Sequence, residues 1–108
     1  FMKEHNAIEI NDILNNKKNK LIILDVREKW EYDICHIKES VHIPMGQIAE
    51  RKDELNMEDT IIVVCHHGIR SRMVAKFLDA SGFINVINLS GGVDSWSKEV
   101  DQSMPKYV

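Results

Sequence analysis

The chain has 108 residues, of which 44% are hydrophobic and 29% are charged, a composition typical of a single globular domain. Its net charge of −3 argues against a general nucleic-acid binder, which would carry a basic surface. Because no apolar run approaches the roughly 20 residues that span a bilayer and no signal peptide opens the chain, we expect a cytoplasmic protein with neither membrane nor nucleic-acid partners.

The first half of the chain is predicted to alternate short helices with strands. Apolar residues at helical spacing predict a helix over 10–16, followed by a polar turn over 15–20. The continuous apolar run 21–24, which ends at Asp25, is typical of a buried parallel strand. The next predicted elements are a helix over 28–33, a brief strand over 40–43 stopped by Pro44 and Gly46, and a helix over 47–55.

The second half continues the same alternation. We predict a strand over 61–64, a helix over 71–80 ended by Gly82, a strand over 86–89, a turn at Gly91-Gly92 and a closing helix over 93–99. Strands that alternate with helices indicate an α/β fold, in which helices cover both faces of a parallel sheet. Ligands of such sheets bind beyond the carboxyl ends of the strands.

The chain is expected to form one domain over residues 1–108. Its core is predicted over about 8–99, and the tail 100–108 shows no clear pattern. Phe1 precedes Met2, so we expect Phe1 to be an addition ahead of the natural start. The two cysteines lack CxxC spacing, which favours a reducing compartment, and the abundance of Ile, Asn and Lys suggests a bacterial source.

Cys65 is the most informative residue, because it stands between the apolar strand 61–64 and a glycine-containing loop that leads into a helix. Backbone N–H groups and the helix dipole favour an anion there, and a thiolate is the nucleophilic form of cysteine. A cysteine after an apolar strand is otherwise usually an inert core residue. Gly68, which permits close backbone approach, and Arg70, a permanent charge near the sulfur, favour a reactive thiol.

Five segments, in order, resemble the signatures of rhodanese-like sulfurtransferase domains. They are Leu24-Asp25-Val26-Arg27-Glu28 with Trp30-Glu31-Tyr32, then His36-Ile37, Ile43-Pro44, the Cys65–Arg70 loop, and Leu89-Ser90-Gly91-Gly92 with Trp96. The resemblance covers about Ile8 to Glu99. It implies a rhodanese-like α/β fold with a central parallel sheet of about five strands, flanked by helices on both faces.

The resemblance also implies a sulfurtransferase. Cys65 would take a sulfane sulfur from thiosulfate, a persulfide or a polysulfide, hold it as a persulfide, and pass it to cyanide or a thiol. The implied partners are small-molecule donors and acceptors or a persulfide-carrying protein, and no metal or organic cofactor is implied. In this interpretation Cys65 and Arg70 are catalytic, and the substrate-binding residues are His66, His67, Gly68, Ile69, Ser71 and Arg27.

The length of the loop separates sulfur transfer from related chemistry. Cys65 and Arg70 enclose four residues, whereas the phosphatases and arsenate reductases that share this fold enclose five and so accommodate a tetrahedral oxyanion. The count therefore favours sulfur transfer over a phosphatase or an arsenate reductase. A binding module without turnover stays open as an alternative.

Several residues near this loop allow two interpretations. Cys35 stands where the family has glycine, and is either a second redox thiol or a partly buried spectator. Adjacent histidines in a tight loop are expected to point in different directions, so His66 and His67 are expected to shape access or move protons and to hold no metal. Asp25 is expected to bond nearby backbone, while Arg27 either touches substrate or pairs with a carboxylate such as Glu31.

The remaining expectations concern packing and surface. Trp96 is expected to pack in the core against the last helix. Arg72 either adds positive potential at the mouth of the site or lies on a solvated face. His42, which replaces the family's usual asparagine, is expected to be a modest surface change.

Overall fold

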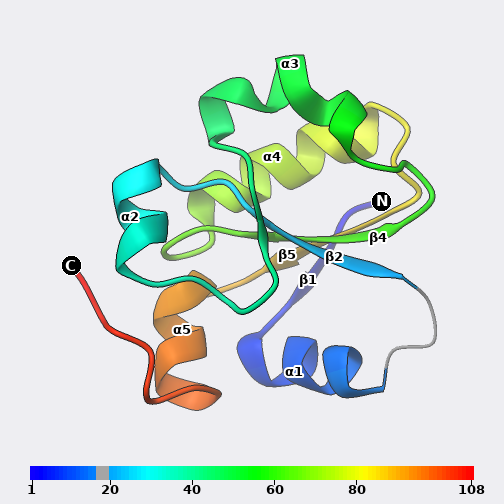
Figure 1. Cartoon of the computed structure of the whole chain (residues 1–108). Coiled ribbons are helices and arrows are strands. Elements are labelled where there is room, and N and C mark those ends of the chain that lie inside the picture. Colours follow the sequence, from blue (N-terminus) through cyan, green and yellow to red (C-terminus); the bar gives the residue numbers. More distant parts are fainter. Residues whose placement is uncertain (17–19) are drawn as a thin grey trace.

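Five parallel strands form the central sheet, in the order β1-β5-β4-β2-β3 (Figure 1). The structure is a computed structural model that describes residues 1–16 and 20–108. The sheet confirms the predicted α/β fold with about five strands. The strands are β1 (Lys3–His5), β2 (Leu21–Asp25), β3 (Val41–His42), β4 (Thr60–Val64) and β5 (Asn85–Leu89).

Helices cover both faces of this sheet. The helices α1 (Ala7–Asn15) and α5 (Gly92–Glu99) lie on one face, and α3 (Ile48–Arg51) and α4 (Ile69–Ala80) lie on the other (Figure 1). The short helix α2 (Lys29–Ile34) follows β2. The two-sided cover explains why every residue of β4 is buried and why its sequence shows no alternation of apolar and polar residues.

Each face of the sheet has its own core. Because successive side chains of a strand point to opposite faces, Ile62 and Val64 pack with Ala7, Ile10 and Trp96 beneath α1 and α5. The residues Ile61, Val63 and Cys65 pack on the other face, in a core that also includes Val74, Ala75 and Leu78 of α4. The predicted core position of Trp96 is confirmed.

The structure departs from the predicted elements at the start of the chain. The edge strand β1 was not predicted, because its Lys-Glu-His sequence has no apolar pattern and only its register beside β5 makes it a strand. Helix α1 begins three residues earlier than predicted, at a capping box in which the side chains of Asn6 and Glu9 bond each other's backbone N–H. Residues 17–19 of the predicted turn over 15–20 lie outside the described residues.

Two further differences lie later in the chain. The predicted helix over 47–55 is divided into a 3₁₀ turn (Met45–Gln47), α3 and a second 3₁₀ turn (Lys52–Glu54). The tail also packs where no pattern was visible, since Met104 is buried in the core beneath α5. Among the described residues, no helix is long and apolar enough to cross a membrane.

A buried ion pair joins the end of β2 to the turn after it. The side chains of Asp25 and Arg27 are at most 1% exposed, and the Arg27 Nη2 lies 2.7 Å from the Asp25 Oδ2. Arg27 also donates to the Cys35 carbonyl at 2.6 Å, and its backbone N–H donates to the Asp25 Oδ1. Of the two interpretations of Arg27, pairing with a carboxylate is therefore the one observed, with Asp25 as the partner in place of Glu31. The structural role expected for Asp25 is confirmed.

The burial of this pair predicts a large effect of removing one partner. We expect Asp25→Ala to lower the free energy of unfolding by about 3–5 kcal/mol, because the Arg27 charge stays buried without its counter-ion. Urea denaturation followed by circular dichroism measures the change. The control is Asp33→Ala, which breaks the exposed 2.6 Å pair with Lys29 and should cost no more than about 0.5 kcal/mol. Equal losses in the two variants would contradict the prediction.

Candidate active site

Cys65 follows β4 at the carboxyl end of the sheet, where the fold predicts a ligand site. It is only 1% exposed. Its Sγ accepts a hydrogen bond from the Gly68 backbone N–H at 3.0 Å. Among the described residues, Gly68 provides the one direct hydrogen bond to this sulfur.

Gly68 makes the turn that brings its N–H to the sulfur. It has a φ of +99°, in the left-handed region that favours glycine, and it caps the start of α4. A Cβ atom at this position would lie 3.0 Å from the Gly91 backbone nitrogen, closer than ordinary packing allows. The Gly68 carbonyl accepts hydrogen bonds from the Arg72 N–H and from the Asn88 side chain at 3.1 Å. Conformation and contacts together therefore require glycine here.

The N-terminus of α5 holds the other side of the loop. The backbone N–H groups of Val93 and Asp94 donate to the carbonyls of Cys65 and His66, at 2.9 and 3.1 Å. A Cβ atom at Gly92 would clash with both of these carbonyl oxygens. Gly91-Gly92, predicted as a turn and quoted for the resemblance, therefore also provides the close backbone approach that a glycine at a helix start indicates.

Arg70 is held by Glu31 and does not point freely at the sulfur. Its Nη1 and Nη2 donate to the two Glu31 carboxylate oxygens at 2.7 and 2.9 Å, a bidentate pair. The hydrogen bonds from Arg70 are the main cause that lowers the pKa of Glu31 to about 2, although burial opposes them. Sequence reasoning missed Glu31 as a site residue, although it lies in the Trp-Glu-Tyr segment that carries the resemblance.

The two histidines of the loop lie together, so the expectation that they point in different directions is wrong. Their ring centroids are 3.9 Å apart. His66 is buried and stacks with its ring 4.0 Å from the Tyr107 ring. Burial, followed by the neighbouring charge of His67, lowers the pKa of His66, which favours the neutral ring. His67 is 59% exposed, with its Nε2 4.0 Å from the Asp94 carboxylate.

His66, His67 and Asp94 are the described residues best placed to hold a metal ion. Each offers one ligand atom, and these atoms lie within 4.8 Å of one another. Ligand distances of about 2.0–2.2 Å in a tetrahedral site would require ligand atoms roughly 3.4 Å apart. Since Asp94 also pairs with Lys98 at 3.1 Å, the trio would have to rearrange before it could bind a metal.

Tyr107 is a residue of the site that no pattern in the sequence indicated. Its hydroxyl accepts a hydrogen bond from the Arg27 Nη1 at 3.0 Å and donates one to the Glu31 Oε2 at 2.7 Å. Burial is the main cause that raises the pKa of Tyr107 to about 12, so the phenol keeps its proton. No local pattern could reveal these contacts, because they join residues more than 70 positions apart.

The other predicted site residues are placed as follows. Ile69 is 67% exposed. Ser71 is fully buried, and its Oγ has no hydrogen-bond partner among the described residues. The Arg27 side chain has no exposed surface, and its charge is paired with Asp25. Arg72 pairs with the Glu4 carboxylate of β1 at 2.5 Å.

Two further residues were interpreted from their departure from the family pattern. Cys35 is a buried free thiol in the core beneath α1 and α5, on the face of the sheet opposite to Cys65. His42 is half-buried, and its Nε2 lies 2.7 Å from the Arg27 carbonyl oxygen, so this nitrogen carries the proton. The expectation that His42 is a modest surface change is therefore wrong.

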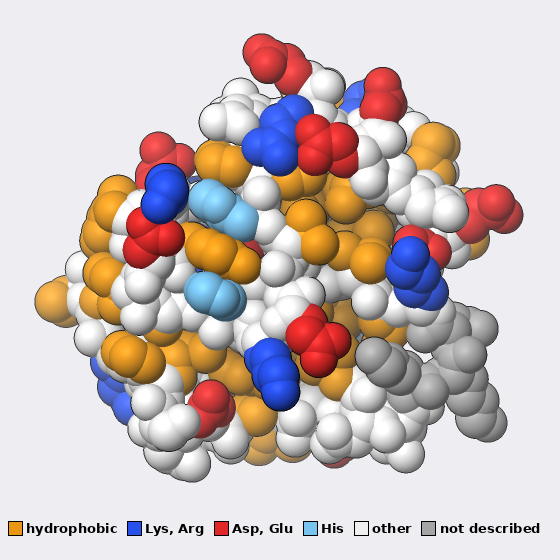
Figure 2. All heavy atoms as spheres, in the orientation of Figure 1, with side chains coloured by type: hydrophobic (Ala, Val, Ile, Leu, Met, Phe, Trp, Pro, Cys, Tyr) orange, Lys and Arg blue, Asp and Glu red, His pale blue; other side chains and the backbone are white. Residues whose placement is uncertain are grey.

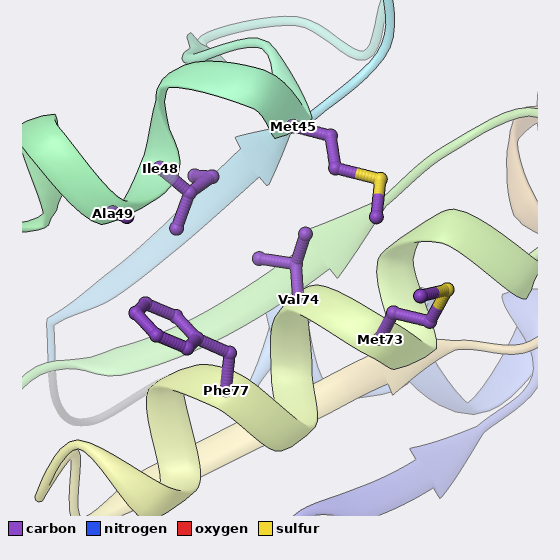
Figure 3. Close-up of a pocket in the computed structure, with 6 residues that line it drawn as sticks. All are labelled: Met45, Ile48, Ala49, Met73, Val74 and Phe77. Carbon is purple, nitrogen blue, oxygen red and sulfur yellow. The ribbon is translucent and has the colours of Figure 1, made fainter.

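An apolar pocket of about 210 Å³ lies between α3 and α4 (Figure 3). In the close-up, Met45 and Ile48 extend towards Met73, Val74 and Phe77 of α4. Met73 and Phe77 remain 58% and 40% exposed. On the face shown in Figure 2, acidic and basic side chains are interspersed among hydrophobic ones, so neither sign of charge dominates it.

Comparison with known proteins agrees with this geometry. The family model described as "Rhodanese-like domain" matches residues 6–99. The chain is 44% identical over 81 residues to a putative sulfur carrier protein, YrkF, of Bacillus subtilis; the match covers 75% of the chain and 44% of that protein. It is 36% identical over 80 residues to the thiosulfate sulfurtransferase GlpE of Coxiella burnetii, covering 74% of the chain and 75% of GlpE.

A solved structure shows the same fold. The crystal structure of a rhodanese-related protein from Thermoplasma volcanium matches with a TM-score of 0.81 and 30% identity, over 91% of this chain and 93% of that one. The chain thus spans less than half of the Bacillus protein but most of GlpE and of the Thermoplasma protein.

The Glu31–Arg70 pair predicts how stability depends on pH. Because the pKa of Glu31 falls from 4.5 to about 2 on folding, its charged form stabilises the fold fully above about pH 4.5, and this contribution is lost as the pH falls towards 2. We expect Glu31→Gln to cost about 3 kcal/mol at neutral pH, and to approach the wild type below about pH 3. Urea denaturation across this range measures both.

The matched control for this prediction is Glu54→Gln, which removes an exposed pairing with Arg51. We expect it to change the stability little at any pH. A Glu31→Gln variant with the full acid dependence of the wild type would show that another carboxylate is responsible.

Proposed function

Because the chain belongs to the rhodanese-like domain family, we propose that it is a sulfurtransferase in which Cys65 carries the sulfur. The observation that supports this most directly is the placement of Cys65. Its thiol ends a buried strand and accepts the Gly68 N–H at 3.0 Å, at the start of a helix. Such a site offers a backbone hydrogen-bond donor to the sulfur of Cys65, and subsequently to an anionic sulfur attached to it.

The proposed reaction has two steps. The Cys65 thiolate attacks the sulfane sulfur of thiosulfate, the sulfur–sulfur bond of the donor breaks, and sulfite leaves with the electron pair. Cyanide or a thiolate then attacks the terminal sulfur of the Cys65 persulfide. This step forms thiocyanate or a new persulfide and regenerates the thiolate, so neither step requires an external oxidant or reductant.

The loop supplies the groups that would stabilise the terminal sulfur. We assign this role to the backbone of residues 66–71, with Gly68 N–H as the donor already in place. The buried Ser71 hydroxyl, which has no hydrogen-bond partner among the described residues, is a further polar group of this segment. Exposed His67 and Ile69 would contact the incoming donor.

The charges around the loop bear on the choice of donor. Arg70 shares its charge with Glu31, so its proposed help to an anionic donor is partial. The nearby formal charges cancel in pairs: Arg70 with Glu31, Arg27 with Asp25, and Lys98 with Asp94. We therefore propose that backbone N–H groups provide most of the attraction, so that persulfides and polysulfides, including a protein persulfide, serve as donors beside thiosulfate.

The setting of the reaction is also proposed. Both cysteines are free thiols, which supports the cytoplasm as a reducing location.

Two alternative functions can each be tested by experiment. A binding module would use the loop without turnover, and a phosphatase or arsenate reductase would need the loop to hold an oxyanion, which the four residues between Cys65 and Arg70 disfavour.

The proposed function predicts a persulfide on Cys65. After incubation with thiosulfate and removal of excess donor, intact mass spectrometry without reductant should show a gain of one sulfur. The gain should disappear after addition of cyanide, because cyanide accepts the terminal sulfur. Cys65→Ser should show no gain, whereas Cys35→Ser, the matched control on the opposite face of the sheet, should load as the wild type does.

The alternatives give different results in the same set of variants. Failure to load from thiosulfate, polysulfide and glutathione persulfide would contradict the carrier mechanism. Hydrolysis of an aryl phosphate that depends on Cys65 would favour the phosphatase. A binding module would bind its partner equally well after Cys65→Ser.

A further inference from the structure

The tail beyond α5 folds back onto the active site. The Asp101 N–H donates to the Trp96 carbonyl at 2.9 Å, and the buried Met104 side chain fixes the tail to the core beneath α5. From there the tail runs past α5 on the side of α2 (Figure 1). These residues lie outside the matched family segment 6–99, so their contacts with the site are a property of this chain that the family match does not describe.

The hydroxyl group of Tyr107 connects two ion pairs. It accepts from the Arg27 Nη1 and donates to the Glu31 Oε2 at 2.7 Å. The same Glu31 oxygen accepts from the Arg70 Nη2, and the other accepts from the Arg70 Nη1. The Glu31 carboxylate, and through it the Arg70 guanidinium, is therefore tied by Tyr107 to the buried Arg27.

The ring of Tyr107 holds a second side chain of the loop. It stacks on His66 at a centroid distance of 4.0 Å and an interplanar angle of 13°. Its edge packs against Trp30 of α2, with centroids 5.8 Å apart and planes at 77°. One residue thus contacts the loop through its ring and orients Arg70 through its hydroxyl.

We propose that Tyr107 is a positioning residue of the active site, which fixes Arg70 through Glu31 and fixes His66 by stacking. The sulfur-transfer consequence rests on the proposed function, but the positioning itself does not. Without the hydroxyl, the Glu31–Arg70 pair can shift relative to Cys65. Without the ring, His66 is exposed on the face that Tyr107 now covers.

Variants at Tyr107 separate these two roles in a Cys35→Ser background, in which Cys65 is the one cysteine left. Tyr107→Leu should raise the pKa of His66 towards its ordinary value, as followed by NMR titration, because the ring becomes solvated. Tyr107→Phe should leave the pKa of His66 low. Both variants should change by several-fold the ratio of Cys65 alkylation rates with iodoacetate and iodoacetamide, which reports the placement of the Arg70 charge.

Two comparisons make the test specific. Tyr107→Phe is expected to lose about tenfold in kcat/KM for thiosulfate, because the Tyr107 hydroxyl that it removes bonds two charged groups. The same substitution should cause no further loss in a variant that already carries Glu31→Gln. The control Tyr32→Phe removes a hydroxyl that bonds the Ser40 carbonyl at 3.0 Å in another stack of rings, and should change none of the readouts.

The outcomes decide the two proposals separately. Absence of sulfur transfer in the wild type would overturn the proposed function, while the His66 titration and the alkylation ratio would still test Tyr107. An unchanged alkylation ratio in Tyr107→Phe, together with an unchanged His66 pKa in Tyr107→Leu, would overturn the positioning role. If Tyr107→Leu fails to fold, the Tyr107→Phe alkylation ratio and its coupling to Glu31→Gln decide alone.

Discussion

The active-site loop depends on the close approach of the α5 N-terminus to the backbone that follows β4. Gly92 leaves room for the carbonyls of Cys65 and His66, and the next two N–H groups of α5 bind those carbonyls. With the carbonyls turned towards α5, the Gly68 N–H is free to turn towards the sulfur. Two backbone segments separated by more than 20 residues thus shape this turn, and the Asn88 side chain supports it through the Gly68 carbonyl.

Charged side chains around this turn act mainly on one another. The Asp25–Arg27 pair is fully buried, and Glu31 receives Arg70 on both oxygens. This pairing gives each buried charged side chain a partner of opposite charge. It also holds α2 against the loop and leaves little net charge near the thiol. The Gly68 backbone N–H also acts on the thiol sulfur, and its dipole does not change with pH.

The sequence was sufficient for the fold and for the position of Cys65 at the carboxyl end of the sheet, because apolar runs are local patterns. It was insufficient where tertiary contacts decide the structure. The polar strand β1 exists only through its pairing with β5, and the Glu31–Arg70 and Tyr107–His66 contacts join distant segments. Asn6 and Glu9 are different, since their capping-box spacing was readable and was overlooked.

The burial of Cys65 also affects how readily the free thiol is oxidised. A thiol that is 1% exposed is shielded from peroxide, since oxidation of cysteine follows exposure as well as thiolate character. Under the proposed function, the unloaded thiol would therefore be protected from oxidation for as long as the loop encloses it.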